Sequence, residues 1–235
     1  MQRILEASYM TDITLLYCTA NIMPDMVSER IRQNLLEITK GAYPIISVSQ
    51  KPIDFGTNIC VGQIGKSCYN FFKQMLTGAK LVKTDYIVHI DDDTLYVPEH
   101  FTHRPPNLNT FIWNTNTWIG GDKLFWHPKE ELSGMFCHIS PTRVLIDNLA
   151  ARFKMHPTKP RDDHHFGEPG KFDTEFGIPN AKVEKFSTKI PLISFEYRGS
   201  LNGKRKRFGL TDPNQYKYDL EYFGNAKKLY EKFWS

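Results

Sequence analysis

The segment Tyr86–Phe101, YIVHIDDDTLYVPEHF, places three consecutive aspartates directly after a run of mostly apolar residues. The first five residues, YIVHI, suit a strand that is buried on both faces of a parallel sheet. A single aspartate after such a strand is typical of a turn or a helix cap. Three in a row lie where open α/β sheets bind their ligands, at the carboxyl end of a strand. The segment therefore predicts both a buried central strand and a ligand site at its end.

The three aspartates, Asp91, Asp92 and Asp93, also favour a bound cation. Neighbouring carboxylates repel one another, and each raises the pKa of the others unless a positive charge lies among them. Mg²⁺ and Mn²⁺ bind carboxylate oxygens and share their remaining positions between water and substrate phosphates. Because alternate residues in a turn can face one side, we expect Asp91 and Asp93 to converge while Asp92 points elsewhere or reaches the ligand.

Upstream of this segment, the sequence alternates between strand and helix patterns. Strands are predicted at 13–18 (ITLLYC) and 45–48 (IISV). A helix with Asp25 as its cap has apolar residues at helical spacing up to Ile38, and a second helix follows in GKSCYNFFKQMLTGA. Strand, helix, strand, helix, strand indicates right-handed crossovers and a mostly parallel α/β sheet with helices on both faces.

Downstream, the pattern is less regular. NTFIWNTNTWIGG indicates a hairpin or two short strands around 114–116, and 134–139 is predicted to be a strand. Ser140 and Pro141 are typical of a helix start. The long segment 156–170 is rich in Pro, Gly, His and charge and is predicted to be a loop. IPLISFEY predicts a late strand, and 220–234 a final amphipathic helix.

Composition is that of an ordinary globular protein. The chain has 235 residues, 40% hydrophobic, 13% aromatic and 24% charged, with a net charge of +4. No apolar run approaches the roughly 18 residues of a membrane span, and the N-terminus lacks the apolar core of a signal peptide. The four scattered cysteines suit free thiols in a reducing compartment, so a cytoplasmic location and no membrane anchor are expected.

Two local features suggest anion binding without defining it. GQIGKS (62–67) has two residues between its glycines where a P-loop requires four, so a P-loop is not predicted. A glycine before a helix start, with Lys66 nearby, still favours an anionic group. The basic run 204–207 (KRKR) suits either a solvated loop or an anionic partner, and the mild net charge does not by itself predict nucleic acid.

With these elements in order, the chain resembles the GT-A glycosyltransferases that use nucleotide-sugar donors. DYIVHIDDDT resembles their D-x-D segment, and GKSCYNFFKQMLTGAKLVKTDYIVHIDDDT is similar to their glycine, basic residue, Asn, helix, strand, D-x-D progression. The resemblance covers about 13–97. It implies one GT-A domain over 1–235, with a nucleotide-sugar-binding half at about 1–100 and an acceptor-binding half at about 101–235.

The resemblance also implies roles for individual residues. Asp93 would bind Mn²⁺ or Mg²⁺ directly, and Asp91 would approach the ribose or a metal-bound water. The other implied donor-binding residues come from the ends of the first two strands, the start of the second helix, the middle aspartate and the basic run: Thr19, Asn21, Ser49, Gln50, Lys66, Asn70, Asp92, Lys204, Arg205 and Arg207.

The segment KFDTEFG (171–177) resembles the acidic segment that supplies the catalytic base in inverting members of the family. Asp173 is the first candidate for this base, then Glu175 and Glu168; a carboxylate there would take the proton of the acceptor hydroxyl. Capping of a helix is the alternative role of Asp173. The chain has no His after His165, so a third metal ligand is absent or comes from 162–165 (DDHH), and inversion or retention stays open.

The sequence therefore predicts a metal-dependent glycosyltransferase that moves a sugar from a nucleotide-diphosphate donor to an acceptor hydroxyl. The acceptor stays open among a hydroxylated DNA base, a saccharide and a protein. A nucleotidyltransferase acting on sugar phosphates is the second hypothesis, disfavoured because CTANIMPDM, after the first strand, has no glycine, Lys or Arg. A non-catalytic sugar-nucleotide or nucleic-acid binding module is the third, disfavoured by the intact acidic triplet.

Overall fold

A mostly parallel sheet forms the centre of the molecule. The computed structural model describes residues 11–127, 134–161, 166–170, 173–197 and 216–235. Within them the main sheet has the strand order β10-β6-β9-β4-β1-β2-β3, and only β9 runs antiparallel to its neighbours. The strands are β1 Ile13–Thr19, β2 Ile45–Ser49, β3 Thr57–Cys60, β4 Tyr86–Asp91, β6 Thr110–Asn114, β9 His138–Pro141 and β10 Lys182–Phe186.

A second, smaller sheet of mixed direction lies beside the first, in the order β12-β8-β7-β11-β5. Its strands are β5 Thr94–Leu95, β7 Thr117–Gly120, β8 Phe125–Trp126, β11 Leu192–Phe195 and β12 Tyr216–Lys217; a hairpin of β13 Asp219–Leu220 and β14 Gly224–Asn225 follows. Because β5 begins three residues after β4 ends, the chain passes from the main sheet to the second sheet through the aspartates.

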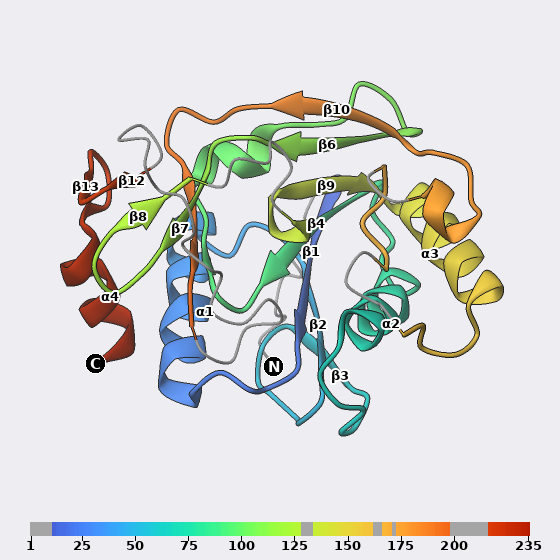
Figure 1. Ribbon diagram of the computed structural model, residues 1–235, viewed down its shortest axis with the longest axis horizontal. Coiled ribbons are helices and arrows are strands. Elements are labelled where there is room, and N and C mark those ends of the chain that lie inside the picture. The colour runs from blue at the N-terminus through green and yellow to red at the C-terminus, as the bar shows by residue number, and fades with distance from the viewer. Residues whose placement is uncertain (1–10, 128–133, 162–165, 171–172, 198–215) are drawn as a thin grey trace, which may run out of the picture.

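Helices cover both faces of the main sheet (Figure 1). They are α1 Asp25–Thr39, α2 Cys68–Ala79, α3 Thr142–Met155 and α4 Ala226–Trp234, with 3-10 turns η1 Pro98–Thr102, η2 Met135–Cys137 and η3 Thr174–Phe176. Alternate residues of β1 face opposite cores: Leu15 packs in the cluster that contains Leu35 of α1, and Leu16 packs with Met75 of α2 and Leu145 of α3. Strand alternation therefore explains why one apolar strand needs helices on both sides.

This architecture confirms the predicted fold class. The parallel strands β1, β2 and β4 are joined through α1 and α2, and the second half adds an antiparallel strand and a mixed sheet. The fold is of the α/β type implied by the GT-A resemblance, with a Rossmann-like first half and a less regular second half. No helix in the described part of the chain is long and apolar enough to cross a membrane.

Several predicted elements differ from the structure in the second half. Of the two alternatives predicted for 110–120, the structure has two short strands and no hairpin, because β6 pairs with β9 and β10 of the main sheet while β7 pairs with β8 and β11 of the second. The predicted strand 134–139 starts as the 3-10 turn η2 and becomes β9 only at His138. The last helix begins at Ala226, since 219–225 forms a hairpin.

Two smaller corrections concern the first half and the helix starts. The strand β3 was not predicted, so the aspartates follow the fourth strand of the chain rather than the third. Asp25 is the first residue of α1, after Pro24, and its side chain makes no capping hydrogen bond. Likewise Ser140 and Pro141 finish β9, and α3 begins at Thr142.

Candidate functional site

The carboxyl ends of β1, β2 and β4 meet at one edge of the main sheet. The parallel registers pair Thr19 with Ser49 and Cys18 with Asp91. These registers bring the ends of the first two strands, where donor-binding residues were predicted, next to the aspartates. The position is the one at which open α/β sheets bind ligands.

The first two aspartates at this edge turn in different directions. Asp91, with about a quarter of its side chain exposed, lies 2.6 Å from His89 Nε2 through its Oδ1 atom. Asp92 accepts a 2.6 Å hydrogen bond from the hydroxyl of Thr19. Burial, and the charge of Asp91 beside it, raise the pKa of Asp92 to about 6, although the Thr19 hydrogen bond opposes this shift. The two carboxylates thus have separate hydrogen-bond partners, while the charge of Asp91 still raises the pKa of Asp92.

The third aspartate is held by the second sheet. Asp93 Oδ1 accepts hydrogen bonds from the hydroxyls of Thr94 (3.0 Å) and Ser194 (3.3 Å). The carbonyl of Asp93 accepts a 2.7 Å hydrogen bond from the amide of Phe195. Strand β11, about a hundred residues later in the chain, therefore sets the position of the residue predicted to bind a metal.

A hydrogen-bond network stiffens the turn after β1. The Thr19 hydroxyl accepts a hydrogen bond from the amide of Asn21 at 2.9 Å, and Asn21 Oδ1 accepts from the amides of Gln50 (2.8 Å) and Lys51 (2.9 Å). Asn21 has a positive φ of 53°, a conformation that Asn tolerates better than most residues. The ends of β1 and β2 are therefore joined through one amide side chain.

Some predicted donor-binding side chains are occupied by protein contacts. Ser49 is fully buried, and its hydroxyl accepts a 2.9 Å hydrogen bond from Asn58 of β3. Gln50 is also buried and pairs with both backbone groups of Gly65, at 3.0 and 3.1 Å. We therefore assign the Ser49 side chain to holding β3 and the Gln50 side chain to holding the loop before α2, since neither faces solvent.

At the start of α2, the predicted Asn70 has a similar structural part. Its side-chain amide donates hydrogen bonds to the carbonyls of Ile64 (2.6 Å) and Gly65 (3.0 Å). The Ser67 side chain caps the helix by accepting a hydrogen bond from the backbone amide of Asn70. Lys66 is exposed in this loop. A helix start with an exposed lysine beside it suits an anionic group, which keeps Lys66 as a donor-binding candidate.

Asp173, the first candidate for the catalytic base, lies in a buried ion pair. Asp173 and Arg152 of α3 have no exposed side-chain surface, and their charged groups are in direct contact. Asp173 also accepts hydrogen bonds from the amides of Gly170 (2.8 Å) and Ala181 (2.6 Å). A carboxylate with these partners has no access to an acceptor hydroxyl, so the geometry contradicts its assignment as a base; nor does its side chain cap η3.

The other two candidate bases lie close to this ion pair in the sequence. Glu175 is exposed in η3, whereas Glu168 is partly buried and its carbonyl accepts a 3.1 Å hydrogen bond from Arg152. Because its side chain is exposed, Glu175 is the better candidate for the catalytic base. The predicted basic residues Lys204, Arg205 and Arg207, and the possible metal ligands in 162–165, lie outside the described residues.

The sequence did not predict two residues from other elements, Tyr197 and Arg32, that interact electrostatically with the aspartates. Tyr197 follows β11, and its pKa is raised by burial and then by the charges of all three aspartates. Arg32 of α1 is half-buried; its charge lowers the pKa of Asp92, and its guanidinium lies 5.8 Å from the ring of Phe55. No local pattern marks either residue, but His89 could have been noticed, since it precedes Asp91 by two positions and shares its side of β4.

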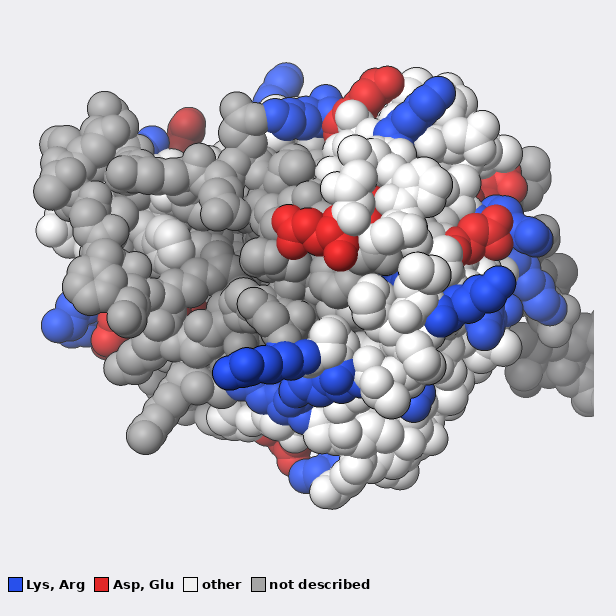
Figure 2. Space-filling model, turned by 45° about the vertical axis from the view of Figure 1, so that its right-hand side comes forward, with Lys and Arg blue, Asp and Glu red and all other residues white. Residues whose placement is uncertain are grey.

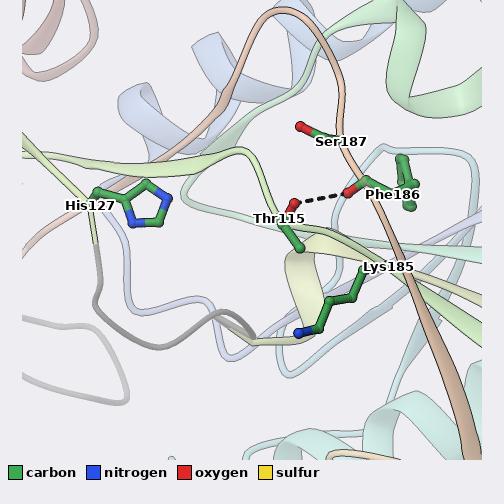
Figure 3. A pocket seen from close by; sticks show the side chains of 5 residues that line it. All are labelled: Thr115, His127, Lys185, Phe186 and Ser187. Atoms are coloured by element: carbon green, nitrogen blue, oxygen red, sulfur yellow. Dashed lines mark hydrogen bonds between the residues drawn. The ribbon is translucent and has the colours of Figure 1, made fainter.

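A shallow hollow lies farther along the same sheet edge. It has a volume of about 390 Å³ and is lined by Thr115, His127, Lys185, Phe186 and Ser187 (Figure 3). Thr115 follows β6, and Phe186 is the last residue of β10. The Thr115 hydroxyl donates a 3.1 Å hydrogen bond to the Phe186 carbonyl. Because β9 separates β6 from β4, these two strands are roughly 10 Å apart at the usual spacing of strands, and β10 lies one strand farther from the aspartates.

The charge of the surface is mixed. Figure 2 shows separate groups of Lys and Arg with Asp and Glu between them, and the described residues form no continuous basic band on this face. Neutralising many nucleic-acid phosphates normally requires clustered Lys and Arg. The face shown in Figure 2 therefore gives no support to a nucleic-acid partner.

The donor set at the sheet edge fits a hard divalent cation only in part. Asp91 and Asp93 provide carboxylate oxygens, and the pKa of Asp92 is raised first by burial and then by the negative charge of Asp91, which a cation would offset. Among the described residues, no three His, Cys, Asp or Glu side chains are grouped so that they could hold a metal by themselves. A metal here would need further oxygens from water and a substrate, which is usual for Mg²⁺.

Comparisons with known proteins give structural likeness at low similarity. No protein-family model matches the chain, and no curated protein does. A glycosyltransferase involved in glycosylation of the major capsid of PBCV-1 has a TM-score of 0.45 and 10% identity, over 74% of this chain and 81% of that one. The mannosyltransferase PcManGT of Pyrobaculum calidifontis, in complex with GDP-Man and Mn²⁺, has a TM-score of 0.46 and 11% identity, over 81% of this chain and 59% of that one.

Nucleotidyltransferases are similar to the same degree. A cytidylyltransferase of Thermus thermophilus has a TM-score of 0.46 and 10% identity, over 76% of this chain and 90% of that one. The bifunctional IspDF of Campylobacter jejuni has a TM-score of 0.43 and 11% identity over 76% of this chain, which spans 50% of that protein. With TM-scores below 0.5, these likenesses support no choice between the two activities.

Proposed function

We propose that the chain is a glycosyltransferase that takes a nucleotide-diphosphate sugar as donor and requires Mn²⁺ or Mg²⁺. The observation that carries this proposal is the group of aspartates at the end of β4, Asp91 to Asp93, called the acidic tip below. Three adjacent carboxylates lie at the carboxyl edge of a parallel sheet, beside the ends of β1 and β2, and the pKa of Asp92 is raised to about 6. Such an arrangement is costly for the apo protein, so a cationic ligand is its simplest explanation.

In this proposal each residue near the tip has a distinct part. Asp93, held by Ser194, and the exposed part of Asp91 would hold the metal; Thr19 and Asn21 would border the nucleotide, and Lys66 would lie near its phosphates. When bound, the metal would act as a Lewis acid that neutralises charge on the departing nucleotide diphosphate. The basic run 204–207 is proposed to assist at the same diphosphate.

The acceptor would bind on the side of the second half of the chain. The hollow beside β6 and β10 opens on the same edge as the aspartates, which suits an acceptor that must reach the donor sugar. Of the two candidate bases that remain, Glu175 and Glu168, Glu175 has the exposure that proton transfer from an acceptor hydroxyl needs. A saccharide, a protein and a hydroxylated DNA base are the candidate acceptors, and a cytoplasmic location is part of the proposal.

A nucleotidyltransferase acting on sugar phosphates is the second candidate, because nucleotidyl transfer also uses paired carboxylates with Mg²⁺. Against it stands the loop between β1 and α1, residues 20–24, which has no glycine, Lys or Arg and is short and tied down through Asn21. It offers no basic group to a nucleoside triphosphate. The donor type therefore separates the two proposals.

A thermal-unfolding screen tests the proposal directly. The chain is heated with UDP, GDP, ADP or CDP, each with and without Mn²⁺, and with the matching triphosphates. We expect stabilisation by one nucleoside diphosphate only with Mn²⁺; at 100-fold excess over its Kd this amounts to about 2.7 kcal/mol. Asp93→Ala should abolish the response, whereas Asp219→Ala, an exposed aspartate in β13, should retain it.

Two outcomes would contradict the proposal. The absence of any metal-dependent response would remove the donor site, and a response confined to triphosphates would favour nucleotidyl transfer. Nucleotide release from the stabilising sugar donor, measured with oligosaccharides, peptides and hydroxylated DNA, then identifies the acceptor. A DNA acceptor should also show binding that weakens steeply as salt increases, because phosphate contacts release counterions.

A further inference from the structure

His89 lies behind the acidic tip and contacts one of its carboxylates. It precedes Asp91 by two residues in β4, so both side chains point to the same face of the sheet. The imidazole is 1% exposed, and its Nε2 atom lies 2.6 Å from Asp91 Oδ1. The ring of Phe71 from α2 packs edge-on against it, with centroids 5.1 Å apart and planes at 88°. The imidazole is therefore held in place on the side away from solvent.

The main chain of the same two residues is also fixed. Pairing between β4 and β9 ends at Val88. Beyond Val88, the hydroxyl of Tyr96 forms hydrogen bonds with the backbone of β4. It accepts a 3.1 Å hydrogen bond from the amide of Asp91 and donates a 3.2 Å hydrogen bond to the carbonyl of His89. Tyr96 is itself buried. Both the backbone and the Oδ1 atom of Asp91 thus have fixed partners.

The other imidazole nitrogen of His89 has no comparable role. His89 Nδ1 is buried and has no hydrogen-bond partner in the described part of the chain. Its neighbour across the strand pair, His138, is also fully buried; burial lowers the pKa of His138, and its Nε2 atom likewise has no partner. A buried imidazole with an unsatisfied nitrogen is costly, so its retention needs a compensating contact. For His89 that contact is Asp91.

We propose that His89 is a positioning residue, which donates its Nε2 proton to Asp91 Oδ1 and leaves Oδ2 directed at the donor and its metal. This inference rests on the proposed function. Residues behind a metal ligand orient it, and their replacement commonly weakens metal binding by about 10- to 100-fold. Because Asp91 is only partly buried, without His89 its carboxylate would sample several rotamers, and fewer of them would face the ligand.

The experiment compares two substitutions that differ in where they place a donor. The side-chain amide of glutamine reaches about as far from the backbone as imidazole Nε2, whereas that of asparagine reaches only as far as Nδ1. His89→Gln should retain the contact with Asp91, and His89→Asn should lose it. His103→Asn, a partly buried histidine near Phe186 rather than near the aspartates, is the matched control. Binding of Mn²⁺ is measured by the electron paramagnetic resonance signal of free Mn²⁺, with the nucleotide chosen by the thermal screen.

The expected result is a Kd for Mn²⁺ that is about 10- to 100-fold weaker in His89→Asn, against less than about threefold in His89→Gln and in the control. Equal binding by all four proteins would overturn the positioning role and leave the proposed function intact. Absence of Mn²⁺ binding by the wild-type chain would overturn both.

One measurement needs no substitution. In ¹⁵N-labelled wild-type protein, the proposal requires His89 to carry a proton on Nε2. A neutral His89 with its proton on Nδ1 alone would overturn it even if the His89 variants failed to fold.

Discussion

At the scale of single residues, burial of the Asp92 carboxyl group makes the free energy of unfolding depend on pH. Its pKa, ordinarily 3.8, is raised to about 6 by burial and by Asp91. A carboxyl group with a raised pKa in the folded state favours folding while it is protonated. Its contribution is complete below about pH 4 and is lost as the pH rises through about 6.

We therefore predict that Asp92→Asn, which cannot ionise, is more stable than the wild type at pH 7 without metal. The difference should be at most about 3 kcal/mol and should vanish near pH 4. Urea unfolding across pH 4–8 measures it, and the Asn side chain can still accept the Thr19 hydrogen bond. Unfolding free energies that run parallel across this range would show that Asp92 has no raised pKa.

Asp173 has a structural role at the same scale. Its ion pair with Arg152 is fully buried, and removing one partner leaves an unpaired buried charge. We predict that Arg152→Met and Asp173→Leu each cost about 3–5 kcal/mol, while the double variant recovers much of the loss. Glu175→Gln, at an exposed position, should change stability by less than about 0.5 kcal/mol.

Activity assays on the same variants distinguish this role from catalysis. An Asp173→Asn variant of wild-type stability without turnover would restore Asp173 as the base. Turnover lost in Glu175→Gln at unchanged stability would support the proposed base.

At the scale of elements, a glycine near the end of α2 sets the distance between this helix and the main sheet. Gly78 of α2 packs directly on the side chains of Leu16 in β1 and Val48 in β2. A Cβ atom at Gly78 would lie 2.7 Å from Val48 Cγ2, and in even closer contact with Leu16. The glycine therefore permits the end of α2 to approach the sheet closely.

We predict that Gly78→Ala destabilises the chain by about 1–3 kcal/mol, because overpacking outweighs the gain in helix propensity. Lys73→Ala, an exposed position on the same helix, should have almost no effect. Denaturant unfolding checks both. A more stable Gly78→Ala variant would mean that helix and sheet can separate freely.

At the scale of the whole molecule, an apolar cluster ties the end of the chain to its beginning. Phe233 and Leu229 of α4 pack with Phe195 of β11 and with Val27 and Ile31 of α1. The side chain of Arg30 in α1 donates hydrogen bonds to the carbonyls of Lys232 (3.1 Å) and Phe233 (3.2 Å). Helix α1 also packs against the main sheet, so the cluster couples the two sheets.

We accordingly predict a single cooperative unfolding transition for the chain. Phe233→Ala should cost about 3–5 kcal/mol and should lower amide protection in β1 as well as in α4. Hydrogen exchange read by mass spectrometry measures both, with Tyr222→Ala, an exposed aromatic, as control. Loss of protection in α4 alone would show that 1–100 and 101–235 unfold separately.

The sequence by itself determined the alternating first half and the acidic tip. Strand and helix periodicity there depends on local patterns of apolar residues, and three aspartates after a buried strand are visible without any fold. Only the tertiary structure decided that Asp173 is buried against Arg152 and that β6 and β7 belong to different sheets. It also decided that Ser194 and Tyr197 lie near the aspartates. Contacts such as Asp93–Ser194 join residues about a hundred positions apart, and neither periodicity nor spacing carries information about them.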